Sequence, residues 1–167
     1  MLNHALANEA VLALKTLSAD RNIMGASFFA LHDLFDSQFK QLIDISHQIA
    51  EGARMLGGNT IGSLQEFIDF TRLEEQPGIV PDALQLLKDH EKIIHFLRED
   101  AKKCSEEFEE EDIFELIMSV IRLHEKMVLI LRSLLESPLT ENEPKKSGFE
   151  NSTLGTFLTR EKYELIL

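Results

Sequence analysis

Apolar side chains recur at steps of three and four residues in four long segments, and this periodicity constrains the fold more than any other feature of the sequence. The segments cover residues 2–22, 27–56, 82–108 and 112–136. Such spacing places apolar side chains on one face of an α-helix, whereas the two-residue alternation of a β-strand does not compete anywhere in the chain. We therefore predict an all-α protein with four long helices, of which the strongly apolar fourth is the most buried.

Glycines and capping residues mark where these helices end. Gly25 breaks the first pattern, Ser27 is suited to cap the second helix, and the pair at 57–58 follows that helix, where glycine is favoured. Ser63 precedes Glu66 by three residues, which is the spacing of a capping box and predicts a short helix over 62–70. Pro81 or Asp82 would open the third long helix.

The long connection over 57–81 decides the topology. It can carry the chain back along the bundle, so that the second and third main helices run in the same direction. This crossover is typical of ferritin-like four-helix bundles, here with a short extra helix inside it. After residue 136 the sequence becomes rich in Pro, Asn, Ser and charge. We expect one bundle domain over 1–136 and a C-terminal extension over 137–167 that is partly mobile or docks on another subunit.

Composition excludes several classes of protein. The formal net charge of -12 disfavours broad contact with nucleic acid phosphates and suits cations instead. The single cysteine, Cys104, excludes an intramolecular disulfide, fits a reducing cytoplasm and is expected to be inert. The start of the chain lacks the pattern of a signal peptide, and no apolar stretch reaches the roughly 18 residues of a membrane span. We expect a soluble, cytoplasmic protein without a membrane partner.

Four side chains with metal-binding chemistry share one stripe of the second helix: His32, Asp36, His47 and Glu51. At about 100° per residue they fall within an arc of roughly 100°, but at about 1.5 Å per residue His32 and His47 lie roughly 22 Å apart. One chain therefore cannot close a single site from all four. The usual di-iron centre inside a bundle is also disfavoured, because none of the six histidines follows a Glu by three residues.

Two copies of this helix could resolve the separation. If they pack antiparallel about a two-fold axis near Gln41 and Leu42, the His32 end of one copy meets the His47 end of the other. Such a dimer makes each contact twice and would carry two equivalent sites, whose imidazole and carboxylate groups suit Fe(II) or Zn(II). The other histidines have simpler interpretations. We expect His90 and His95 on a solvated face and His124 as a partly buried, hydrogen-bonded imidazole.

The run DRNIMGASFFALHDLFDSQFKQLIDISHQIAEGARMLGG resembles the signature of the Dps family, the mini-ferritins. That signature reads His-Trp-x-x-x-Gly-x-x-Phe-x-x-x-His-x-x-x-Asp, then Asp-x-x-x-Glu, then Gly-Gly, and the likeness extends over about residues 2–136. Three ligand positions agree with it: His32, Asp36 and Glu51. The chain departs at two other ligand positions, with Asp20 in place of the first ligand histidine and His47 in place of an acid, and it has Arg21 in place of Trp.

The resemblance implies that Asp20 of one subunit faces His47 and Glu51 of a two-fold partner around one iron, with His32 and Asp36 beside it. The two changes then look like an exchange that retains one imidazole and two carboxylates. All five residues become candidate catalytic and metal-binding residues. Iron is the expected metal, although zinc or an empty site remains as an alternative.

The implied function is that of a ferroxidase that stores iron. In such proteins Fe(II) is oxidised by hydrogen peroxide or oxygen, and ferric mineral is held in a hollow dodecamer. Glu111 and Glu115 stand about where the family lines its three-fold pores, or else they belong to a solvated helix start. The alternative function is a structural or regulatory assembly without ferroxidase activity, in which Asp20 and His47 form an interface salt bridge. DNA binding is not expected, because no Lys-rich tail precedes the first helix.

Overall fold

The computed structural model describes residues 1–25, 28–108 and 110–136, and all of its regular secondary structure in these ranges is helical. The predicted extension over 137–167 and the predicted cap at Ser27 lie outside the described residues. The helices are α1 (Leu2–Arg21), α2 (Phe28–Met55), α3 (Leu64–Phe70), α4 (Ala83–Lys103), the short π-helix η1 (Cys104–Phe108) and α5 (Glu111–Leu135). The all-α prediction is confirmed, and η1 prolongs α4 to the predicted end at Phe108.

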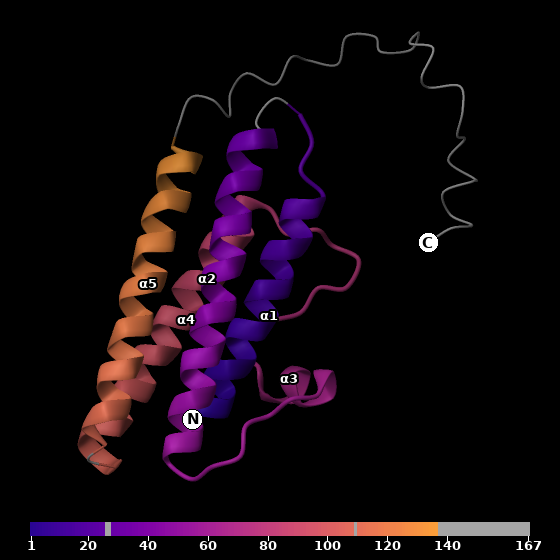
Figure 1. Ribbon diagram of the computed structural model, residues 1–167. Coiled ribbons are helices and arrows are strands. Elements are labelled where there is room, and N and C mark those ends of the chain that lie inside the picture. The colour runs from indigo at the N-terminus through magenta and orange to yellow at the C-terminus, as the bar shows by residue number, and fades with distance from the viewer. Residues whose placement is uncertain (26–27, 109, 137–167) are drawn as a thin grey trace, which may run out of the picture. The chain divides into compact units, whose positions relative to one another are not determined.

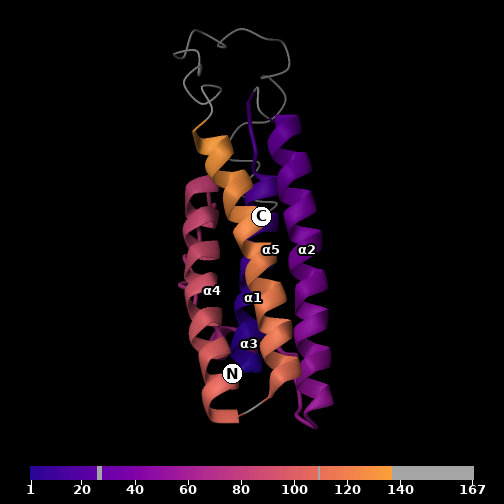
Figure 2. The same cartoon turned by 90° about the vertical axis from the view of Figure 1, so that its left-hand side faces the viewer.

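Four long helices form the bundle, and the second and third of them run in the same direction, as the long connection predicts. Figure 1 shows α1 and α5 running one way, while α2 and α4 run the other way. Helix α1 packs along α2, and α4 packs along α5. The view turned by 90° shows α2 and α4 on opposite sides of α5 (Figure 2). The connection that contains α3 therefore returns the chain to the end of the bundle where α2 began, as in ferritin-like bundles.

Local capping explains where the helices start and end. The Ser63 hydroxyl accepts a hydrogen bond from the backbone N–H of Glu66, whose carboxylate accepts in turn from the N–H of Ser63, so the predicted capping box is present. At α4 the Asp82 carboxylate caps the backbone N–H of Gln85 at 2.7 Å. Gly57 has a φ of 76°, a left-handed conformation that suits glycine at the end of α2.

The most buried long helix is α1 rather than α5, so that part of the sequence prediction is wrong. Buried positions of α1 include Asn8 and Lys15, which are polar. The reason is that α3 and the segment after it cover the face of α1 that the other long helices leave open. The Asn8 side chain accepts from the backbone N–H of Arg72 at 2.7 Å, and the Lys15 ammonium donates to the carbonyl of Glu74 at 2.9 Å.

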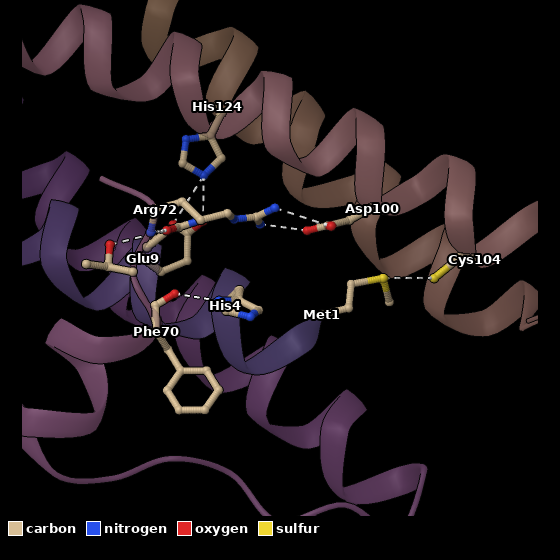
Figure 3. Close-up of polar contacts among 10 residues, drawn as sticks. Met1, His4, Glu9, Phe70, Arg72, Asp100, Cys104 and His124 are labelled. Carbon is tan, nitrogen blue, oxygen red and sulfur yellow. Dashed lines mark hydrogen bonds and ion pairs between the residues drawn. The ribbon is translucent and has the colours of Figure 1, made fainter. Parts of the chain in front are cut away.

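Arg72 fastens the crossover to the bundle. Its guanidinium donates two hydrogen bonds to the carboxylate of Asp100 on α4, at 2.6 and 3.3 Å (Figure 3), and lies 4.6 Å from the centre of the Phe96 ring. A bidentate pair fixes the planes of both groups, so it sets direction as well as distance. Asp100 is buried, which protects the contact from screening by solvent.

We predict that Asp100→Ala lowers the free energy of unfolding by about 1–3 kcal/mol, because Arg72 loses its partner in a partly dry site. Urea denaturation at fixed protein concentration measures the change. The matched control is Glu125→Ala, since Glu125 pairs with Arg98 between exposed side chains and should contribute less than about 1 kcal/mol. Equal effects of the two variants would contradict the role given to Arg72.

Candidate metal site

Asp20 and His32 meet where α1 ends and α2 begins. The Oδ1 atom of Asp20 lies 2.7 Å from the Nδ1 atom of His32, although the two residues are twelve positions apart. The Asp20 side chain is 10% exposed and the His32 side chain 46% exposed, so the carboxylate lies inside and the imidazole reaches the surface. The ring of Phe28 stacks on the imidazole with 5.6 Å between centroids and 9° between planes. Chemically this is an oriented imidazole at the bundle surface.

Asp36 lies one turn further along α2 and is half-exposed. Its Oδ2 atom accepts a hydrogen bond of 2.6 Å from the ammonium of Lys40. This hydrogen bond, together with the charge of Asp36, raises the pKa of Lys40 above its usual value. A cation that binds Asp36 must therefore displace Lys40 or share the carboxylate with it.

His47 and Glu51 lie nearer the other end of α2, and both are exposed. They line an open hollow together with Arg54 and Thr60. Spacing of four residues puts their side chains on the same face of the helix, one turn apart. Within one chain they form a second pair of possible ligands, separate from the pair at His32.

The structure thus divides the predicted ligands into two groups and does not bring them together. In the part of the chain that the structure describes, no group of three or more His, Cys, Asp or Glu side chains is arranged to hold a metal ion. Both groups lie on one helix, α2, so helix geometry keeps them apart along its axis. The donor chemistry fits Fe(II) or Zn(II), because each group offers an imidazole and a carboxylate.

Lys40 is paired with Asp36, whereas Arg21 pairs with none of these groups. Arg21 is exposed and makes no ion pair with any described residue. Glu111 and Glu115 are exposed in the first turns of α5, and their part in a pore stays a prediction. Cys104 is buried, and burial raises the pKa of its thiol above the usual value, which agrees with the expected inert cysteine.

A buried polar chain inside the bundle was missed by the sequence analysis. The Nε2 atom of His124 on α5 lies 3.0 and 3.2 Å from the two carboxylate oxygens of Glu9 on α1, as Figure 3 shows. The Nδ1 atom of His124 lies 2.8 Å from the Nδ1 atom of His90 on α4. All three side chains are fully buried. We call Glu9, His124 and His90 the buried relay.

The prediction that His90 lies on a solvated face is wrong, whereas the exposed His95 agrees with it. A usable signal was present, because His90 falls on the apolar stripe of Leu86, Ile93 and Leu97 at steps of three and four residues. The charged residues Asp89 and Glu91 on either side of His90 made that stripe hard to recognise. His124 is hydrogen-bonded as predicted, but it is fully rather than partly buried.

Burial, followed by the nearby His124, holds the pKa of His90 well below its usual range. The unfolded chain therefore takes up a proton more readily than the folded chain once the pH falls below the unfolded pKa of about 6.5. We predict that the free energy of unfolding decreases from pH 7 to pH 5, by up to about 1.4 kcal/mol per pH unit for this group.

Urea denaturation across this pH range, at fixed protein concentration, measures the slope. His90→Leu should be less steep than the wild type, while His95→Leu should not differ because His95 is exposed. An unchanged slope in His90→Leu would show that another group carries the acid sensitivity.

Comparison with known proteins identifies a matching family and several relatives of this chain. A model of the ferritin-like domain family matches residues 1–137. A low temperature-induced protein of Nostoc is 31% identical over 92% of this chain and 88% of its own length. A DNA protection during starvation protein of Agrobacterium fabrum is 40% identical over 46% of this chain and 48% of its own length. No helix within the described ranges is long and apolar enough to cross a membrane.

Solved structures agree with the bundle. DpsC from Streptomyces coelicolor superposes with a TM-score of 0.76 at 23% identity, over 87% of this chain and 84% of that one. The Dps protein from Vibrio cholerae, described as a member of a broad superfamily of ferritin-like diiron-carboxylate proteins, gives 0.75 at 25% identity over 81% and 86%. The predicted ferritin-like bundle is confirmed.

Proposed function

Because the chain belongs to the Dps family of ferritin-like proteins, we propose that it oxidises Fe(II) and stores the ferric product inside a hollow dodecamer. Iron storage and protection are the general functions that this family membership supports. The observation that carries the specific proposal is the division of possible ligands into two groups along one exposed face of α2. Among the described residues, neither group has three such side chains arranged to hold a metal.

A two-fold partner supplies the missing ligands in this proposal. Two antiparallel copies of α2, crossing near Gln41, would bring His32 and Asp36 of one subunit to His47 and Glu51 of the other. Each dimer would then carry two equivalent sites. Exposure of both groups in the single chain supports this arrangement, since the side chains are not already used in the bundle core.

The reaction is an electron transfer for which the protein supplies binding groups. Two Fe(II) ions each lose one electron, and hydrogen peroxide accepts both electrons with two protons to give two molecules of water. Carboxylates at Asp36 and Glu51 would favour Fe(III) over Fe(II), because anionic oxygen ligands bind the higher charge more strongly. Lys40 would leave Asp36 as the ion arrives, which removes a competing positive charge. Oxygen is the second oxidant we consider.

Access of Fe(II) to the interior would follow the acidic first turns of α5. Glu111 and Glu115 are exposed and one turn apart, so three-fold packing could gather them into a ring that attracts cations. We place this activity in the cytoplasm, where the buried Cys104 would stay reduced, and we propose no DNA partner.

One observation favours a second candidate function, a structural or regulatory shell that has lost ferroxidase activity. Asp36 is already paired with Lys40, so one ligand position is neutralised without metal. The interface salt bridge expected between Asp20 and His47 has less support, because Asp20 is engaged by His32 of its own chain. The two candidate functions differ in iron chemistry and not in assembly.

We predict that His47→Ala with Glu51→Ala lowers the initial rate of iron oxidation at least about tenfold, because half of each shared site is lost. The measurement is anaerobic loading with Fe(II), followed by peroxide and absorbance of the ferric product. The matched control is His95→Ala with Glu99→Ala, which removes another exposed His and Glu four residues apart. A wild type no faster than the first double variant would rule out the ferroxidase and leave the inert shell.

The molecular mass of the assembly in solution tests whether the proposed shell forms. We expect light scattering coupled to size exclusion to give a dodecamer for the full chain, and the same mass for the His47→Ala, Glu51→Ala variant. An intact shell in the variant makes its loss of oxidation a local effect. A monomer or isolated dimer for the wild type would remove the storage function.

A further inference from the structure

The contact between Asp20 and His32 assigns a different role to Asp20 than that of a metal ligand. We infer that Asp20 is a positioning residue, which holds His32 through Nδ1 so that the Nε2 atom of His32 is presented to the metal. The inference rests on the proposed function, because that function supplies the metal that His32 would bind. It deepens that function, because it separates the residue that binds from the residue that orients.

The chemistry of the two groups sets the direction of this hydrogen bond. A carboxylate can only accept, so the Nδ1 atom of His32, at 2.7 Å, must carry the hydrogen. In a neutral imidazole the other nitrogen then has a free lone pair. Nε2 of His32 is therefore the coordinating atom. Metal-binding histidines commonly donate their second N–H to a carboxylate in this way, which fixes the tautomer and raises the basicity of the ligand.

Burial separates the two roles in space. The Asp20 side chain is 10% exposed, whereas the His32 side chain is 46% exposed. The imidazole therefore lies between the carboxylate and the surface at which a partner subunit would arrive. Phe28 adds a second constraint, because its ring lies nearly parallel to the imidazole and restricts rotation about the side-chain bonds. The ring of His32 is thus held at one edge by Asp20 and on one face by Phe28.

The position of Asp20 in α1 explains why it needs such a donor. Helix α1 ends at Arg21, so Asp20 lies in the last turn, where the helix dipole disfavours a negative charge. Arg21 is exposed and makes no ion pair within the described part of the chain, so it does not neutralise Asp20. The N–H of His32 offsets this unfavourable position.

Two variants separate an orienting carboxylate from a coordinating one. Asp20→Asn keeps an oxygen that can accept from Nδ1–H of His32, but a neutral amide is a poor metal ligand. Asp20→Ala removes both properties. If Asp20 orients His32, the Asn variant should retain most of the metal affinity. If Asp20 binds the metal directly, both variants should lose it alike.

The first readout needs no metal. Magic-angle-spinning NMR of the full chain, metal-free and labelled with ¹⁵N-histidine, reports which nitrogen of His32 carries the hydrogen. The sample is held at about pH 8, above the ordinary range of histidine pKa values, and His32→Gln identifies the signal. We expect Nδ1–H in the wild type and in Asp20→Asn, and a mixture of tautomers in Asp20→Ala. Nε2–H in the wild type, or no change in Asp20→Ala, would overturn the inference.

The second readout is affinity for Zn(II), which binds similar ligands without being oxidised. Competition with a chelator should show a loss of about 10–100-fold for Asp20→Ala and clearly less for Asp20→Asn. Asp33→Ala is the control, because Asp33 is an exposed carboxylate next to His32 on α2. Equal losses in both Asp20 variants would make Asp20 a direct ligand and would contradict the inference.

The outcomes distinguish this inference from the proposed function. If the wild type does not bind Zn(II), the proposed metal site fails whatever the tautomer of His32. If the wild type binds Zn(II) and Asp20→Ala binds it equally well, only the positioning role fails. The oxidation assay with the His47 and Glu51 variant is independent of Asp20 and tests the proposed function alone.

Discussion

Enclosure of α1 is the constraint on which the rest of the structure depends. The antiparallel partner of α1 covers one face of it, and the crossover has to cover another, so the connection cannot be a short hairpin. Because an irregular segment brings unpaired backbone groups into the interior, α1 must offer polar partners there. Asn8 and Lys15 are those partners. The same arrangement leaves the outer face of α2 uncovered, and the possible metal ligands lie on that face.

Most of the fold could be predicted because its signals are local. Apolar periodicity gives the long helices, and the pair Ser63 and Glu66 specifies the start of α3 within four residues. The burial of α1 could not be predicted in this way, since it depends on where a distant segment lies. The burial of His90 could not be predicted for a related reason. Its neighbours Asp89 and Glu91 are charged, and only its contact with His124 on α5, which in turn contacts Glu9 on α1, shows why an imidazole belongs inside.

The sequence could predict those features of the candidate site that depend only on the spacing of residues along one helix. Helix geometry alone separates His32 from His47, and no knowledge of other helices is needed. The contact of Asp20 with His32 is different, because it depends on how α1 and α2 meet across their connection. A pattern of residues makes Asp20 a candidate member of the site. Only the geometry indicates whether its oxygen faces a metal or another side chain.

The buried relay has a consequence for the alignment of the helices along their axes. Apolar side chains tolerate a slide of one helix past another, because dispersion forces have little directional preference. Hydrogen bonds between Glu9, His124 and His90 do not, since a shift of one turn would leave a buried imidazole or carboxylate without a partner. The relay therefore fixes the register of α1, α4 and α5. Through α5 it also sets the height at which Glu111 and the following turn emerge at the end of the bundle.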